Sequence, residues 1–249
     1  LHSTSRRQRQ MCIRDRYVTS GFGALVRAYG VTIFVTVVGT CLSVLVIALF
    51  AYPLSRRDFK YKKQFTFLMF ITMVFNGGMV PWYLICTQVL HIQNTVWALI
   101  LPYVFNGWYV VILRTFFSMN IPAELIEAAK IDGATERMIF FRMVLPLALP
   151  GLATIALFQT LAYWNDWWLP LMLTTNDNLQ NLQYMLYKIL SNIQMLSTMT
   201  GDAAGSMAKL PSESARMALC ILAIGPVVFC YPFFQKYFVQ GLTVGSVKG

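Results

Sequence analysis

An uncharged stretch from residue 64 to residue 113 constrains the fold of this chain more than any other feature. A helix crosses the hydrocarbon core of a bilayer with about 20 apolar residues, so this stretch is long enough for two crossings. Further apolar runs occupy residues 28–55, 143–173 and 217–234. Backbone groups in lipid must be hydrogen-bonded within the protein, which favours helices for such segments. The sequence therefore predicts an all-α, polytopic membrane helical bundle.

The composition also indicates a bilayer location. Hydrophobic residues make up 57% of the chain and charged residues only 12%, whereas about 25% of a soluble domain is charged. Several prolines lie inside or at the edges of the apolar runs, where neighbouring helices can satisfy the carbonyls that proline frees, so we expect kinked helices. Five spans are predicted, at about residues 31–53, 65–87, 95–115, 145–173 and 214–235.

Lys and Arg residues are concentrated in alternate connections between these spans. Residues 55–63 carry five of them, whereas the connections 88–94 and 175–212 contain only Lys188 and Lys209. Cytoplasmic loops carry such an excess, so the basic loop 116–144 and the C-terminus are expected in the cytoplasm and the loop 175–212 outside. The net charge of +10 is then matched by anionic membrane lipids rather than by nucleic acid. We expect a multi-pass protein of a bacterial cell membrane.

A short helix is predicted inside the loop 116–144. Pro122 suits the first helical position and Gly133 the left-handed position just past the end of a helix. At 100° per residue, one face carries Leu125, Ala128, Ala129 and Asp132, and another carries Glu127, Lys130 and Ile131. Apolar side chains on several sides of such a short helix indicate packing against more than one neighbour.

The same loop resembles the EAA loop of ATP-binding-cassette (ABC) importer permeases, the membrane subunits that serve a substrate-binding protein. The spacing between the motif residues agrees, and Met143 stands where Ile is usual. Residues 233–242 and the ending 247–249 resemble the carbohydrate-uptake, MalG-like branch, with its MetI-like transmembrane domain. The matching residues, with Asp132 beside them, are Glu127, Ala128, Ala129, Gly133, Leu145 and Pro146.

This resemblance implies a permease subunit of an ATP-driven, binding-protein-dependent importer of sugars or oligosaccharides. The helix in the loop would be the cytoplasmic coupling helix, and the seven residues just named would couple the permease to a separate ATPase. The implied partners are a second permease subunit, a cytoplasmic ATPase dimer that binds ATP and Mg²⁺, and an extracytoplasmic substrate-binding protein. Alternatives are an importer subunit of the same architecture for peptides or another solute, and a channel or scaffold that needs no motor.

The first 16 residues conflict with the predicted orientation. They carry five Arg residues, and the charge pattern of the loops places them outside, against the rule for basic residues. Residues 11–16 also resemble translated sequencing-adapter sequence. We therefore expect residues 1–16 to be a non-native tail, residues 17–249 to be the permease domain, and a first span to be missing, so that five of six expected spans are present.

Motifs for chemistry within the chain itself are absent from the sequence. There is no Gly-x-x-x-x-Gly-Lys-Ser/Thr sequence to cradle nucleotide phosphates, so ATP is expected only on a partner. With His2 and His91 as the only histidines, no set of residues has the spacing of a metal site, and no Gly-x-Ser-x-Gly motif occurs. We predict a transport subunit that is not an enzyme and holds no cofactor or metal.

An aromatic segment, residues 163–170, is the candidate for contact with a transported solute. Its Trp and Tyr residues are typical of an aromatic belt at the membrane interface, the simpler interpretation. The alternative is that Trp164, Asn165 and Asp166 line the outer pathway, since aromatic rings stack on sugars and polar neighbours bond their hydroxyls.

Two further features remain open to more than one interpretation. The external loop 175–212 either faces the substrate-binding protein or is an untethered excursion. Residues 76–78, Asn-Gly-Gly, and residues 106–107, Asn-Gly, either serve the pathway or allow close helix packing, which is the simpler account.

Overall fold

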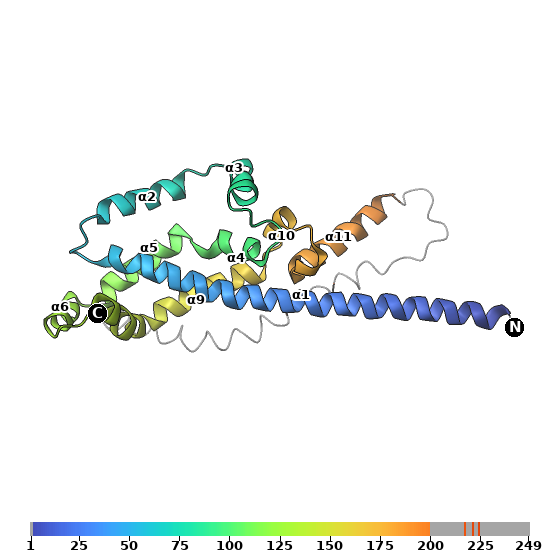
Figure 1. Cartoon of the computed structure of the whole chain (residues 1–249), viewed down its shortest axis with the longest axis horizontal. Helices are drawn as coiled ribbons and strands as arrows, with labels where there is room; N and C mark the ends of the chain where they lie inside the picture. Colours follow the sequence, from blue (N-terminus) through green and yellow to red (C-terminus); the bar gives the residue numbers. More distant parts are fainter. Residues whose placement is uncertain (1, 200–216, 218–220, 222–223, 225–249) are drawn as a thin grey trace.

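The computed structural model describes residues 2–199 together with 217, 221 and 224, so the predicted span 214–235 lies almost wholly outside the described residues. All regular structure in the described part is helical, as predicted (Figure 1). The helices are α1 (His2–Ser55), α2 (Lys62–Val74), α3 (Met79–Leu84), α4 (Val96–Val104), α5 (Gly107–Asn120), α6 (Ala123–Ile131), α7 (Glu136–Ile139), α8 (Leu145–Leu147), α9 (Leu149–Trp164), α10 (Trp168–Leu173) and α11 (Leu182–Met199).

Helix α1 organises the molecule. It runs along the long axis and continues without a break through residues 16 and 17, where the sequence suggested a boundary (Figure 1). Its Gly23–Ser55 portion has 33 residues and is apolar enough to cross a membrane. The small helix α6 lies at the end of the molecule where α1 ends, whereas α11 lies toward the opposite end (Figure 1).

The three following apolar runs form bent pairs of helices. The bends measure 112° between α2 and the helical turns from Met79 to Val89, 50° between α4 and α5, and 79° between the helical residues Glu136–Leu147 and α9. Within the described residues there is one helix long enough to span a membrane, or up to four spans if each bent pair counts as one. Of the kinks expected from proline, the 79° bend is flanked by Pro146 and Pro150, whereas α1 continues through Pro53 and the largest bend is at Asn-Gly-Gly.

The break between α2 and α3 has a backbone cause. Gly78 has φ of 86°, which side-chain-bearing residues rarely adopt, and its N–H donates to Asn76 Oδ1 at 2.9 Å. A Cβ on Gly77 or Gly78 would meet none of the described residues within 4 Å, so close packing within the described part of the chain does not explain either glycine. It is correct for Gly107, where a Cβ would lie 3.1 Å from Met73 Cγ.

The break between α4 and α5 leaves backbone carbonyls without helical partners. Asn106 caps the start of α5 with its own side chain. Ser43 Oγ of α1 donates to the Val104 carbonyl at 2.7 Å, and Gln159 Nε2 of α9 donates to the Tyr103 carbonyl at 3.2 Å. Two neighbouring helices thus supply the hydrogen bonds that the bend removes, which an interior without water requires.

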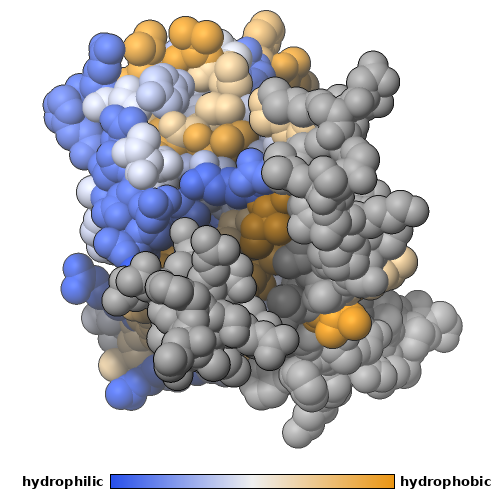
Figure 2. All heavy atoms as spheres, turned by 90° about the vertical axis from the view of Figure 1, so that its right-hand side faces the viewer, coloured by the Kyte–Doolittle hydropathy of each residue, from blue (hydrophilic) through white to orange (hydrophobic). Residues whose placement is uncertain are grey.

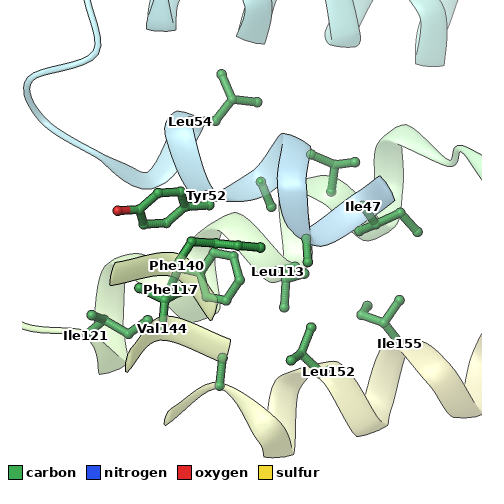
Figure 3. Close-up of a cluster of buried hydrophobic side chains, with 14 of the residues drawn as sticks. Ile47, Tyr52, Leu54, Leu113, Phe117, Ile121, Phe140, Val144, Leu152 and Ile155 are labelled. Atoms are coloured by element: carbon green, nitrogen blue, oxygen red, sulfur yellow. The ribbon is translucent and has the colours of Figure 1, made fainter. Parts of the chain in front are cut away.

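The largest cluster of buried side chains joins the end of α1 to α5 and to the segment from α7 to α9 (Figure 3). Leu113 and Phe117 of α5 lie between α1 and the α7–α9 segment and are almost fully buried. This packing fixes the elements that flank α6 on both sides. The labelled members are Ile47, Tyr52, Leu54, Leu113, Phe117, Ile121, Phe140, Val144, Leu152 and Ile155.

Close contact between α1 and α9 depends on Gly39. A Cβ at this position would lie 2.7 Å from Tyr163 Cζ, and the Tyr163 ring cannot move freely because its hydroxyl donates to the Ile100 carbonyl at 2.9 Å. We expect Gly39→Ala to destabilise the chain by about 1–3 kcal/mol, the usual cost of overpacking.

The matched control for this prediction is Gly30→Ala on the same helix, because a Cβ there would meet nothing within 4 Å. The measurement is the thermal unfolding midpoint of the purified chain in detergent. Equal midpoints for the two variants would contradict the role of Gly39.

The first part of the predicted external loop 175–212 contains regular structure. A 3₁₀ turn, Asp177–Leu179, leads into α11, whose residue Leu182 is fully buried. The remainder of that loop lies outside the described residues.

Much of the described surface is hydrophobic, as a membrane location requires. Figure 2 shows hydrophobic side chains gathered at the top of the end-on view, the level at which Figure 1 places α3. Exposed apolar residues of this region include Met79, Val80, Leu84, Ile85 and Val89.

Candidate functional site

The predicted helix in the loop 116–144 is present as α6. It spans Ala123–Ile131, and Pro122 is its N-cap with φ of −61° and ψ of 139° rather than its first helical residue. The predicted start is therefore one residue early. Proline fits both positions because neither needs its N–H group.

The C-terminal end of α6 agrees with the prediction for Gly133, which has φ of 79°. The Ala134 N–H donates to the Ala129 carbonyl at 2.9 Å, and the Gly133 N–H donates to the Lys130 carbonyl at 3.1 Å. These two bonds form a Schellman motif, which needs a left-handed residue just past the cap. Asp132 is the exposed C-cap residue.

The two motif alanines lie on different sides of α6. Ala129 is buried against the core together with the partly buried Ile126, whereas Ala128 is exposed. The two alanines are 100° apart around the helix, and only Ala129 lies against the core. Four exposed residues, Glu124, Glu127, Ala128 and Ile131, form a stripe at helical spacing that we call the outward face.

The outward face combines charge with an apolar residue. Ile131 is 86% exposed, the largest exposure among the exposed large hydrophobic residues of the described part. Glu127 and Glu124 are exposed about one and two turns before it, respectively. A single exposed Ile needs no explanation by itself, so the outward face is a candidate contact surface because of its place in the motif-bearing loop rather than its composition.

A pocket of about 690 Å³ separates α6 from the segment that follows α1. The pocket wall contains cations from residues 56–62 on one side and Glu124 and Glu127 of α6 on the other. The end of α5 contributes Phe117 and Ser118. Glu124 and Glu127 therefore lie at the border between the outward face and this pocket.

Four alternating charges tie the end of α6 to its neighbours. Arg56 makes two bonds to the Asp58 carboxylate, at 2.6 and 2.9 Å, and one to Glu136 at 3.2 Å. Lys130 of α6 lies 3.2 Å from Asp58 and 2.9 Å from Glu136. The hydroxyl of Tyr52 donates to Glu136 at 3.1 Å. We call Arg56, Asp58, Lys130 and Glu136 the charge ring.

The charge ring keeps its members ionised. Hydrogen bonds from Arg56 hold the pKa of the Asp58 carboxyl below its usual range, and those from Lys130 lower the pKa of Glu136. Hydrogen bonding to Glu136 in turn raises the pKa of Lys130. Because both carboxyl pKa values are lowered, their contribution is present above the ordinary values of about 4 and is lost only as pH falls further. At neutral pH the ring is intact.

Among the ring residues, substitution of Arg56 should loosen α6 most, because the Arg56 side chain is only 10% exposed and contacts both carboxylates. We expect Arg56→Gln to accelerate hydrogen–deuterium exchange in residues 123–139 several-fold at pH 7, since the Asp58 and Glu136 carboxylates would then share Lys130 as their only cation in the ring. Arg57→Gln is the matched control, because Arg57 is exposed and is in none of the ion pairs of the described residues. Equal exchange in both variants would contradict a restraining role.

The remaining motif residues are not on the outward face. Leu145 is partly buried against the core at the start of α8, and Pro146 follows it on the surface. Pro146 and Pro150 flank the break at Ala148, and each lacks the N–H that would continue the helix. These residues shape the 79° bend that leads from α7 into α9.

The aromatic segment is mainly structural in this chain. Asp166 is 6% exposed and accepts hydrogen bonds from the N–H groups of Trp168 and Leu169 at 3.1 and 3.2 Å, which caps the start of α10. The Tyr103 hydroxyl donates to it at 3.3 Å. Trp164 is buried in a cluster with α11, so of the three candidate residues Trp164, Asn165 and Asp166 only Asn165 is exposed.

Sequence reasoning missed Arg56, Asp58 and Glu136 as site residues. Arg56 and Asp58 lie two residues apart after a predicted span, but Glu136 is 80 residues from Arg56 in the sequence. The only signal in the sequence is that both loops contain acidic and basic residues, and charge alone does not specify which residues pair.

Comparisons with known proteins identify relatives over nearly the whole chain. A family model described as the inner membrane component of binding-protein-dependent transport systems matches residues 21–244. The polygalacturonan/rhamnogalacturonan transport system permease protein YtcP of Bacillus subtilis is 42% identical over 88% of this chain and 76% of its own length. The arabinooligosaccharides transport system permease protein AraQ of Halalkalibacterium halodurans is 32% identical over 94% and 78%, respectively.

A solved structure agrees with these relatives. It is a bacterial ABC transporter involved in the import of the acidic polysaccharide alginate, with a TM-score of 0.75 and 28% identity over 86% of this chain and 75% of that one. The fold, the family model and the sequence relatives all indicate the same family. The chain belongs to the family of inner membrane components of binding-protein-dependent transport systems.

Proposed function

We propose that this chain is the permease subunit of an ATP-driven, binding-protein-dependent importer of oligosaccharides. The observation that carries the proposal is the match of residues 21–244 to the family, joined by relatives named for plant-polysaccharide and arabinooligosaccharide transport. The peptide importer and the motor-independent channel or scaffold are not favoured by these relatives. The chain forms half of the translocation pathway and is a transport subunit rather than an enzyme.

Helix α6 is the coupling helix in this proposal. Its outward face, Glu124, Glu127, Ala128 and Ile131, docks on the cytoplasmic ATPase, with Ile131 as the apolar anchor and the carboxylates opposite polar or basic groups. Buried Ala129 anchors the helix to the permease core. Asp132 and Gly133 set the direction in which the chain leaves the helix.

The charge ring transmits displacement of α6 to the spans. It joins Lys130 of α6 both to the end of α1 and to α7, and α7 continues through the bend at Leu145 and Pro146 into α9. A movement of α6 driven by the ATPase therefore acts on two spans at once. The two sites in this scheme are the nucleotide sites of the ATPase and the pathway between permease subunits.

The proposed membrane arrangement counts each bent pair as one span. The described residues then supply four spans. The span expected from the sequence at residues 214–235 lies almost wholly outside the described residues. Loop 116–144 and the C-terminus face the cytoplasm, and residues 175–212 face the substrate-binding protein. The further partners are a second permease subunit, an ATPase dimer that holds ATP and Mg²⁺, and membrane lipids.

Within the aromatic segment, Asn165 is the residue proposed to face the pathway, because its side chain is exposed. The buried side chains of Trp164 and Asp166, on either side of Asn165 in the sequence, hold this segment in place. Sugar hydroxyls are bound by amide groups of this kind.

The test of the function is uptake by membrane vesicles that contain the whole complex. Oligosaccharides of the classes named for the relatives should enter only when ATP, the ATPase and the binding protein are all present. A panel of peptides serves as the competing substrate class. Uptake without ATP would refute the motor-driven importer, and uptake of peptides alone would refute the substrate class.

The topology is tested by single cysteines in a background without the native ones. We expect a cysteine introduced as Asp177→Cys to react with a membrane-impermeant thiol reagent added outside, because this residue is 87% exposed in its side chain. A cysteine introduced as Lys60→Cys, in the exposed basic connection after α1, should react only after the membrane is opened. Reaction of both from outside would contradict the proposed orientation.

A further inference from the structure

A groove of about 520 Å³ lies between the start of α2 and the middle of α5. The two helices lie next to each other at this point, and Arg114 Nη1 of α5 donates to Thr66 Oγ1 of α2 at 3.3 Å. We call it the basic groove. Its lining consists of Lys62, Lys63, Thr66, Phe67, Phe70 and Arg114.

The cations of the basic groove have no acidic partner in the described part of the chain. The ion pairs there involve Arg56, Lys130 and Lys188, and no Asp or Glu lines the groove. Lys62 donates only to backbone carbonyls, those of Ser55 and Arg56, at 3.4 and 3.1 Å. Positive charge is therefore gathered without neutralisation, whereas the neighbouring charge ring is fully paired.

The other half of the basic groove is aromatic and open. Phe67 and Phe70 are 63% and 60% exposed, and both belong to the apolar helix that continues from the cations toward α3. A cationic end followed directly by exposed rings matches a ligand that has an anionic head and an apolar tail. Inorganic phosphate or a nucleotide would use the cations and make no use of the rings.

We propose that the basic groove binds the headgroup of an anionic phospholipid, with its phosphate at Lys62, Lys63 and Arg114 and an acyl chain along Phe67 and Phe70. Basic pockets between membrane helices bind lipid headgroups in this manner. The volume is in the range of small-molecule sites. This site requires only the membrane location that the family has, and it does not depend on which solute is transported.

The test is photo-crosslinking of the chain, purified with the subunits that stay bound, in nanodiscs of one part phosphatidylglycerol to four parts phosphatidylcholine. A p-benzoylphenylalanine incorporated at Phe67 should give adducts enriched about fivefold in phosphatidylglycerol over the bulk ratio. The same probe at Val80, exposed on α3 and away from the cations, should give the bulk ratio.

The enrichment should fall to the bulk ratio in the triple variant Lys62→Gln, Lys63→Gln, Arg114→Gln. It should persist in the matched triple variant Lys60→Gln, Arg137→Gln, Arg142→Gln, which removes the same charge from exposed positions that do not line the groove. Adducts at Val80 report insertion of every variant, so a misfolded chain is recognised.

Two further arms identify the source of the anion. Inorganic phosphate at 10 mM should leave the enrichment unchanged, since it offers no acyl chain for the aromatic wall. Displacement by phosphate would overturn the lipid assignment, as would adducts at Phe67 that contain a polypeptide, which would assign the groove to a partner subunit. A bulk lipid ratio at Phe67 in the parental chain would overturn it as well.

Discussion

Gly133→Val should reduce transport by about tenfold or more while the chain still inserts in the membrane. Gly133 has φ of 79°, and a left-handed backbone costs a residue with a Cβ about 1–2 kcal/mol, with β-branched residues the least tolerant. None of the described residues lies within 4 Å of the position that a Cβ would take, so the cost is backbone strain rather than collision. The strain should shift the end of α6 and loosen the charge ring through Lys130.

A graded series of substitutions at Gly133 distinguishes backbone strain from other causes of reduced uptake. Asn tolerates the left-handed region better than other residues with side chains, so uptake should decline in the order Gly, Gly133→Asn, Gly133→Ala, Gly133→Val. Gly30→Val is the matched control, because Gly30 lies in α1 with open space around its Cβ position. The measurement is binding-protein-dependent uptake in vesicles, normalised to inserted protein. Equal uptake across the series would remove the need for a left-handed residue.

Glu127→Lys should lower co-purification of the ATPase by about tenfold or more. Glu127 is exposed on the outward face, and reversing its charge would bring like charges together at an interface, which costs several kcal/mol. The substitution leaves the core contacts of α6 in place, because Ala129 and Ile126 on the other side are unchanged. Substrate-stimulated ATP hydrolysis should fall with assembly.

The control for this charge reversal is Lys188→Glu on α11, near the opposite end of the molecule (Figure 1). Lys188 makes one ion pair, to Asp177 at 3.6 Å, and no contact with α6 is proposed for it. Co-purification should stay at the parental level in this variant. If Glu127→Lys and Lys188→Glu behaved alike, the outward face would not be the docking surface.

The features that could be predicted from the sequence are those that depend on local chemistry. Apolar runs specify helices in lipid because the backbone has no other partner there, and all the described regular structure is helical. Gly133 could be placed in the left-handed region because Gly ends helices in this way. Helical periodicity, by contrast, places Ile131 on one face of α6 but does not indicate that its side chain is exposed.

The features that could not be predicted depend on contacts between distant segments. Periodicity divides α6 into stripes but does not say which stripe meets the core, so Ala128 and Ala129 were assigned one face. The charge ring joins Asp58 to Lys130 across 72 residues of sequence. The burial of Asp166 follows from the start of α10 and from Tyr103, neither of which a linear pattern reveals.

The exposure of Ile131 has a consequence for the life of the newly made chain. An apolar side chain that is 86% exposed on a helix projecting from the membrane is open to chaperones and proteases until a partner covers it. In the proposed assembly the ATPase covers this side chain, whereas a copy without its motor leaves it accessible. Synthesis in excess of the motor should then be corrected by turnover, which makes the abundance of this subunit follow the supply of its ATPase.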